Sequence, residues 1–166
     1  MFLPGHVSEA ADLNTIIYNR ALSYNGDPET SAWICQAIMY ASSVYNVDPL
    51  LVTAVMESES RFNVNVGHSS AGAVGLMQLM PDTAAMIGVN PYDPLENIIG
   101  GTSYLRTMLD DFAGWGQYQV SYAVCAYNAG WKAVKDANGC PYWETYDYAV
   151  EISQSYNEML QLYQYG

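Results

Sequence analysis

Residues 59–63 read ESRFN and residues 69–81 read SSAGAVGLMQLMP. The run before them, residues 50–56, is apolar on most faces, which predicts a buried helix that ends near Glu59. A carboxyl group there is unusual, because the helix dipole and partial burial both disfavour its charged form. Both effects predict a raised pKa for Glu59, as a general acid near neutral pH requires. This segment alone also allows an ordinary solvated glutamate at a helix end, of which Glu57 is the natural example.

The remaining chain is mostly helical in pattern. Apolar spacing and the Gly, Pro and Asn breaks predict helices over residues 8–24, 29–45, 50–59, 81–88, 95–112, 120–129 and 143–163. In the second helix, the apolar positions near helical spacing are Trp33, Ala37, Met39 or Ile38, Tyr40 and Val44. Residues 62–73 are polar and contain glycine, which predicts a loop, with a small hairpin as the alternative. We therefore predict one mainly α domain over residues 29–166, with residues 1–28 as a peripheral helix or extension.

Composition limits the classes of partner. The chain has 166 residues and a net charge of -12, with 51% hydrophobic and 13% charged residues, which is typical of a folded domain. Only five side chains are cationic, and this argues against nucleic acid or an anionic membrane surface as a partner. We expect no membrane span, because no apolar run approaches about 20 residues. The first residues, MFLPGH, lack the cationic and apolar regions of a conventional signal peptide.

The cysteines and histidines do not form a recognisable metal motif. Cys35, Cys125 and Cys140 permit at most one internal disulfide, and the sequence does not decide which. Cys125 lies in an apolar run, so we interpret it as a small core residue. His6 and His68 stand alone, and there is no CxxC pair. We therefore predict no metal and no cofactor.

Three further groups of polar side chains are candidates for binding a sugar. Gln78 follows two closely spaced glycines and can both donate and accept hydrogen bonds. Tyr127 and Asn128 stand at the end of an apolar run, just before Gly130. Asn128 can fix a substrate or the local backbone there. Residues 141–148 are rich in aromatic rings, which stack on sugar faces. Each segment alone is equally compatible with turn formation or core packing.

Taken together and in this order, these segments resemble the soluble lytic transglycosylase (SLT) catalytic domain, a goose-lysozyme-like family. The family pattern is Glu-Ser-x-Phe-Asn, then Ser-x-x-Gly-Ala-x-Gly-Leu-Met-Gln-x-Met-Pro-x-Thr-Ala, which stands here at residues 59–63 and 69–84. Matching residues follow at Asn97-Ile98, Gly101, Tyr104-Leu105, residues 126–130, Pro141, Glu144-Thr145 and Tyr148. The resemblance covers roughly residues 32–152.

The resemblance implies a lysozyme-like fold with a substrate cleft, and a lytic transglycosylase that degrades peptidoglycan. Glu59 would be the single catalytic acid and base. It would cleave the β-1,4 bond between N-acetylmuramic acid and N-acetylglucosamine as a 1,6-anhydro ring forms. The implied cleft residues are Ser70, Met77, Gln78, Tyr127 and Tyr148, with Asn128 as a further substrate-binding candidate. Ser69 and Ser70 are adjacent, so either can match the family serine, and Tyr148 is the expected partner of Glu59.

The chain departs from the family pattern in places, and two other functions stay open. Val64 stands where a proline is common, and the acidity is atypical of a wall-binding enzyme. One alternative is a lysozyme-type hydrolase on the same fold, with Asp82 or Asp93 as the second carboxylate. The other is a non-catalytic wall-binding module of a secretion, conjugation or phage machine. Any of these implies peptidoglycan strands as partner and an extracytoplasmic location, in the cell wall or periplasm.

Overall fold

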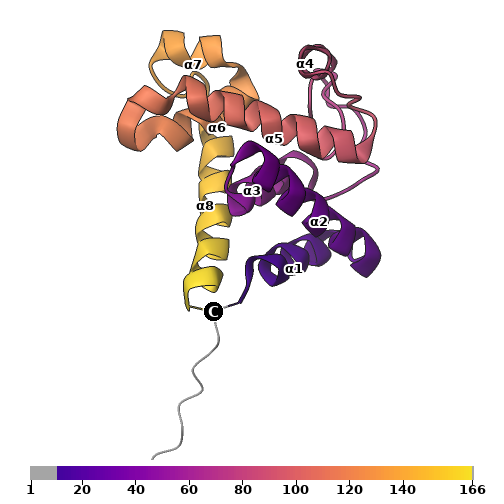
Figure 1. The fold of residues 1–166 in the computed structure, drawn as a ribbon. Coiled ribbons are helices and arrows are strands. Elements are labelled where there is room, and N and C mark those ends of the chain that lie inside the picture. Colours follow the sequence, from indigo (N-terminus) through magenta and orange to yellow (C-terminus); the bar gives the residue numbers. More distant parts are fainter. Residues whose placement is uncertain (1–10, 166) are drawn as a thin grey trace, which may run out of the picture.

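A computed structural model describes residues 11–165 of the chain (Figure 1). The predictions for residues 1–10, including the helix start at Ser8, lie outside this range. The described residues form helices α1 (Leu13–Asn25), α2 (Pro28–Tyr45), α3 (Pro49–Ser60), α4 (Pro81–Ile87), α5 (Pro94–Asp111), the 3-10 helix η1 (Ala113–Tyr118), α6 (Gln119–Ala129), α7 (Trp131–Ala137) and α8 (Trp143–Tyr165).

Asp-Pro pairs begin three of the helices. Asp27, Asp48 and Asp93 each precede a proline, and each carboxylate accepts a hydrogen bond from a backbone N–H in the first turn of α2, α3 or α5. The aspartate satisfies an N–H that the helix leaves unpaired, and the proline occupies a position that needs no donor. These pairs fix where α2, α3 and α5 begin, which explains why the sequence predicts those starts to within one residue.

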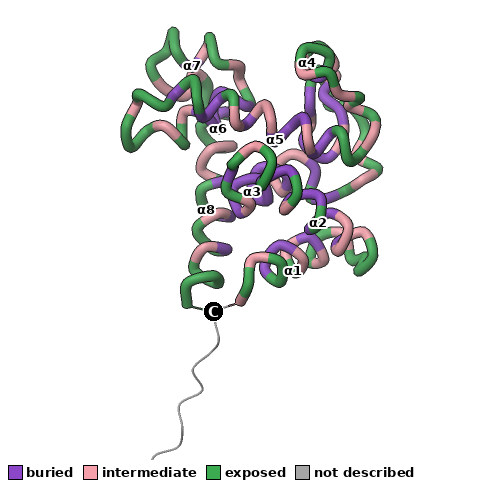
Figure 2. Tube along the Cα trace, in the orientation of Figure 1, coloured by how far each residue is buried: buried purple, intermediate pink, exposed green. Residues whose placement is uncertain are grey.

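Helix α3 is the centre of the structure. All seven residues from Leu50 to Met56 are buried, as the apolar run predicts, and Figure 2 shows this segment almost wholly in the buried colour. Helix α8 packs along α3, while α2 packs against both α1 and α5, and α5 continues the layer towards α6 (Figure 1). The residue at the end of α3 is therefore surrounded by elements distant in sequence.

Several details differ from the sequence-based predictions. No element is predicted over residues 131–137, but they form α7, a helix of two turns in which only Val134 is buried. In α2, Tyr40 and Val44 are exposed, and the buried stripe is Ile34, Cys35, Ala37, Ile38 and Ala41. The prediction favoured large side chains such as Tyr40, whereas the residues of α2 that pack in the core are smaller aliphatic ones. The hairpin alternative reduces to a single β-bridge between Val74 and Leu79.

The mainly α prediction is confirmed, and the other predicted helices over residues 13–165 lie where expected. None of the helices formed by the described residues is both long and apolar enough to cross a membrane.

Candidate functional site

Glu59 is the last residue but one of α3, and the backbone after it is unusual. Arg61 and Phe62 both have positive φ angles, of 50° and 57°. Two successive residues with side chains in this left-handed region are uncommon and disfavoured. The Phe62 side chain is fully buried and its ring packs near Tyr24, which holds the chain in this conformation. The turn therefore ends α3 sharply and fixes the position of Glu59.

Glu59 has one strong hydrogen-bond partner and an altered acidity. The Tyr148 hydroxyl donates to Glu59 Oε1 at 2.5 Å, as the resemblance implied for this pair. Burial raises the pKa of Glu59 from 4.5 to about 7, against the opposing effect of the Tyr148 hydrogen bond. The predicted direction is confirmed, with burial as the leading cause. Glu59 is thus a carboxyl group that carries a proton for much of its time near neutral pH.

Two tyrosines lie in the electrostatic environment of Glu59. Burial raises the pKa of Tyr127 and of Tyr148 well above 10, and the charge of Glu59 raises both further. Both phenols therefore stay protonated and remain hydrogen-bond donors over the pH range in which Glu59 titrates.

Glu57 lies in a different environment, although it is only two residues away on α3. Its carboxylate accepts from Arg20 Nε at 2.6 Å, from the Tyr24 hydroxyl at 2.6 Å and from Ser155 Oγ at 2.7 Å. These groups line a polar hollow of about 360 Å³ between α1, α3 and α8, of which Glu59 is not a lining residue. The interpretation of Glu57 as a solvated glutamate is wrong, because its side chain is only 13% exposed.

A tight turn follows α3 and carries Gln78. The backbone reverses between Val74 and Leu79, with Gly75 at φ 77° and Gln78 at φ 44°. Gln78 Nε2 donates to the Gly75 carbonyl at 2.9 Å, so the amide nitrogen stabilises the turn itself. Gln78 is half-buried and keeps its side-chain oxygen for another partner.

Met77 is held from two sides. Its backbone N–H donates to Asn97 Oδ1 at 2.8 Å, and its carbonyl accepts from the Tyr127 hydroxyl at 2.8 Å. A Cβ atom at Gly101 would lie 2.4 Å from Met77 Cβ, so α5 approaches this closely only because residue 101 is glycine. Tyr127, 8% exposed, therefore supports the turn through its hydroxyl group.

The remaining predicted residues lie nearer the surface. Ser69 and Ser70 are both exposed, and Ser69 Oγ accepts from the Ala73 N–H at 3.0 Å and closes the loop. Asn128 is exposed, and its Oδ1 accepts from Thr145 Oγ1 at 2.9 Å. Ser70 thus has a hydroxyl group at the surface, and Asn128 links the end of α6 to the start of α8.

Asn97 is the residue near this turn whose role the sequence did not predict. It is fully buried in α5, and its Nδ2 donates to the carbonyl oxygens of Val74 and Pro91 at 2.8 and 2.9 Å. A buried asparagine on an apolar helix face is the available signal, because such a group needs partners. Asn97 belongs to the quoted family pattern, but two of its three partners, Val74 and Met77, lie 20 or more residues earlier and cannot be identified from spacing.

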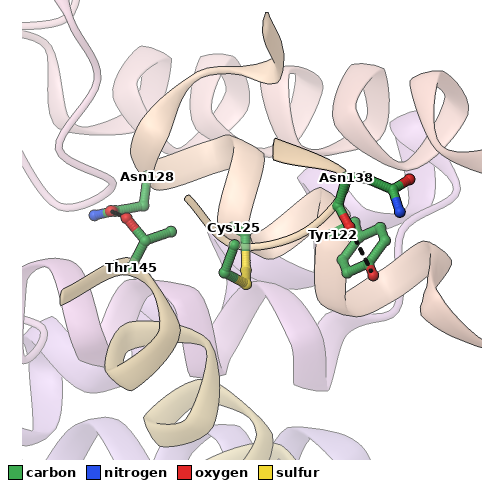
Figure 3. The surroundings of a disulfide bond; sticks show 6 residues. Tyr122, Cys125, Asn128, Asn138 and Thr145 are labelled. Atoms are coloured by element: carbon green, nitrogen blue, oxygen red, sulfur yellow. Dashed lines mark hydrogen bonds between the residues drawn. A yellow bond between two sulfur atoms is a disulfide. The ribbon is translucent and has the colours of Figure 1, made fainter. Parts of the chain in front are cut away.

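A disulfide joins Cys125 in α6 to Cys140 in the turn before α8 (Figure 3). Cys35 is free and buried. Cys125 is therefore a fully buried residue, as predicted, and also one end of a covalent link. The loop that the bond closes contains α7.

Removing the Tyr148 hydroxyl is expected to raise the pKa of Glu59 further. In Tyr148→Phe the carboxylate loses a donor that favours its charged form, so its pKa should rise above about 7. Carbon NMR of the glutamate carboxyl groups over a pH series measures this directly. Tyr146→Phe is the matched control on the same helix and should leave Glu59 unchanged. A pKa for Glu59 that is equal or lower in Tyr148→Phe would contradict the assignment of this hydrogen bond.

The arrangement of helices is the lysozyme-like fold. It superposes with a TM-score of 0.65 on the structure of an inactive Glu-to-Gln mutant of lytic transglycosylase Slt from Pseudomonas aeruginosa. The two chains are 21% identical, and the match covers 88% of this chain and 30% of that one.

The model of the transglycosylase SLT domain family matches residues 36–150, which is more than half of the chain. The chain therefore belongs to this family, and the resemblance noted from its motifs is confirmed.

Curated relatives of the chain are larger proteins. A "Transglycosylase" of Enterobacteria phage PRD1 is 46% identical over 96 residues, covering 57% of this chain and 34% of that protein. Membrane-bound lytic murein transglycosylase F of Cellvibrio japonicus is 31% identical over 139 residues, covering 82% of this chain and 27% of that protein. Transglycosylase C of Actinobacillus succinogenes is 36% identical over 109 residues, or 57% and 30% of the two chains. This chain thus spans about a third of the length of such relatives.

Proposed function

We propose that this domain is a peptidoglycan lytic transglycosylase with Glu59 as its single acid and base. The observation that carries the proposal is the environment of Glu59 in a chain of this family. The carboxyl group is buried at a helix end, its pKa is raised to about 7, and it is hydrogen-bonded to Tyr148. A group of this acidity can donate a proton and take one back near neutral pH.

The proposed reaction uses Glu59 twice. Protonated Glu59 donates its proton to the oxygen between N-acetylmuramic acid and N-acetylglucosamine, and the bond from muramic C1 to that oxygen breaks. The muramic 6-hydroxyl then attacks C1 to form the 1,6-anhydro ring, and its proton returns to Glu59. No water is consumed. Tyr148 remains a neutral donor throughout and stabilises the carboxylate that forms between the two steps.

The relatives support this choice of reaction. Those from Cellvibrio and Actinobacillus are named lytic murein transglycosylases, and the Pseudomonas protein lost activity on a glutamate-to-glutamine change. By analogy we propose an extracytoplasmic place of action on the wall. The relative from phage PRD1 supports a phage machine as one assembly that such a domain serves.

The other site residues have proposed roles that follow from their bonds. Ser70, the Gln78 side-chain oxygen and the Asn128 amide are proposed to bind sugar hydroxyl or acetamido groups, because these atoms lie at or near the surface. We propose that Met77 and Tyr127 act by positioning, since their hydrogen bond fixes the turn before Gln78.

A hydrolase would need a second carboxylate. The surroundings of Asp93 and Asp82, the two candidates from the sequence, do not favour this role. Asp93 Oδ1 accepts from the Glu96 N–H at 2.9 Å and caps α5. Asp82 is exposed in the first turn of α4. The transglycosylase reaction needs no such partner, so it remains the function that the site supports better.

Mass spectrometry of muropeptides released from purified peptidoglycan tests the proposal. The wild-type domain should release anhydro-muramic ends, and Glu59→Gln should lose this activity by at least about 100-fold. Products with reducing ends instead would show that the domain is a hydrolase and would reject the transglycosylase reaction. Full activity of Glu59→Gln would reject the role of Glu59. No product from a wild-type domain that binds the wall would favour the non-catalytic binding module.

A further inference from the structure

Large aromatic side chains gather on one exposed surface around α7 and the start of α8. Trp143 is 80% exposed, Tyr142 59%, Tyr146 52% and Trp131 47%. We call these four residues the aromatic surface. Rings of this size usually bury themselves in a folded protein, so several exposed together mark a contact site.

Two open hollows border the aromatic surface and share Pro141 and Tyr142. One, of about 730 Å³, lies between Tyr142 and Trp131 of α7. The other, of about 620 Å³, lies between Tyr142 and the Trp143–Tyr146 pair, whose rings meet edge to face at 6.3 Å. Tyr142 thus lines both depressions. This relief suits an extended chain of similar units better than one compact ligand.

The backbone beneath Tyr142 is fixed at three points (Figure 3). The disulfide holds Cys140, the Tyr122 hydroxyl donates to the Asn138 carbonyl at 3.3 Å, and Thr145 Oγ1 donates to Asn128 Oδ1 at 2.9 Å. Each bond ties the segment that carries Tyr142 and Trp143 back to α6. A rigid aromatic platform loses little conformational entropy on binding, which favours affinity.

The charges around the hollows are few and nearly balanced. Lys132 and Asp136 form an exposed ion pair at 2.6 Å, and Glu144 is the other charged lining residue. Lys135 lies 4.9 Å from the centre of the Trp131 ring. These four charges cancel, and Asp147, exposed beside Tyr146, adds one negative charge, so most of the net charge of -12 resides elsewhere in the chain. The surface therefore suits an uncharged polar ligand that offers flat apolar faces and hydrogen-bonding groups.

We propose that the aromatic surface binds a run of N-acetylated sugar rings in a glycan strand, through their uncharged ring faces and acetamido groups, as a second contact separate from Glu59. Sugar rings present such apolar faces to stacked aromatics, and their hydroxyl and acetamido groups bond the polar rim. The proposal rests on the proposed function for its polymer, peptidoglycan. Trp143 precedes Tyr148, the partner of Glu59, by five residues of α8, about 7.5 Å of helix rise and about 140° around the helix axis. The aromatic surface therefore lies within the length of a few sugar units of Glu59, on a neighbouring side of α8.

Titration of the full chain with hexa-N-acetylchitohexaose, followed by NMR of the tryptophan indole N–H signals, tests this proposal. The signals of Trp131 and Trp143 should shift, whereas those of Trp33 in α2 and Trp115 in η1 serve as internal references. Tyr142→Ala should weaken the affinity measured from these shifts about ten-fold. Tyr165→Ala removes a ring that is 79% exposed at the far end of α8 and should change neither affinity nor fold.

Each other outcome has a defined meaning. If Tyr142→Ala does not fold, Tyr142→Phe keeps the ring and should bind within about two-fold of wild type. Unmoved Trp131 and Trp143 signals, or an unchanged affinity in Tyr142→Ala, would overturn the proposal. Signals that shift with protein concentration alone would assign the surface to a second copy of the chain and overturn it too. Shifts in a protein that releases no muropeptides would uphold the binding surface and reject only the proposed function.

Discussion

Replacing Glu59 with glutamine is expected to make the protein more stable at alkaline pH and to leave its stability unchanged at about pH 4. The pKa of Glu59 is about 7 in the folded protein, against 4.5 as its ordinary value. Between these values the folded state binds more protons than the unfolded state, so stability falls as pH rises through this window. Glutamine carries no charge and avoids the loss. The free energy of unfolding should rise by about 3 kcal/mol at about pH 8.

Glu57→Gln is the matched control, and the opposite sign is expected. Glu57 is paired with Arg20, so removing its charge leaves a largely buried guanidinium without its nearest partner. Arg20 keeps its ion pair with Glu158 at 3.0 Å, so this change should lower the free energy of unfolding by about 1–2 kcal/mol at neutral pH. Urea unfolding of both variants at about pH 4.5 and about pH 8 measures the difference. A loss of stability in Glu59→Gln at the higher pH would contradict the raised pKa.

The opposite effects expected for Glu57→Gln and Glu59→Gln distinguish a stabilising glutamate from a functional one on the same helix. Glu57 contributes to stability through its partners, whereas the charge of Glu59 is opposed by its surroundings. A residue that lowers stability in its charged form suggests a role other than folding. If Glu59→Gln is both more stable and inactive, the loss of activity cannot be attributed to unfolding. This is the outcome that the proposed function requires.

The fold could be predicted largely because its signals are local. Asp-Pro pairs, glycine stops and the apolar run before Glu59 act within a few residues and specify helix ends. The two errors have local causes as well. Helix α7 buries only Val134, so it leaves almost no apolar periodicity in the sequence. In α2 the sequence favoured Tyr40 and Val44, although packing against α1 and α5 selected Ile34 and Ala41.

The site could be predicted only in part, because its partners come from distant segments. The sequence placed Glu59 at a helix end and suggested Tyr148 through the family resemblance. It did not give the ion pair of Glu57 with Arg20, nor the bonds of Asn97 to Met77 and Val74, since these contacts join residues 20 or more positions apart. The disulfide likewise depends on how α6 and the turn before α8 meet.

Asn97→Ala is expected to be among the most damaging single changes in the described chain. Asn97 makes three hydrogen bonds, to the Met77 N–H and to the Val74 and Pro91 carbonyls. Without it, buried backbone groups lose their partners, and each such loss costs about 1–3 kcal/mol. The free energy of unfolding should fall by about 4 kcal/mol, measured by urea unfolding with circular dichroism.

Thr102→Val tests whether this cost comes from the turn or from any buried polar group of α5. Thr102 is also fully buried, but its hydroxyl bonds only the Ile98 carbonyl of its own helix. Its replacement should cost about 1 kcal/mol. An equally small loss for Asn97→Ala would mean that other contacts hold the turn. A loss several-fold larger would mean that the position of Gln78 relative to Glu59 depends on an α5 side chain that meets neither of them.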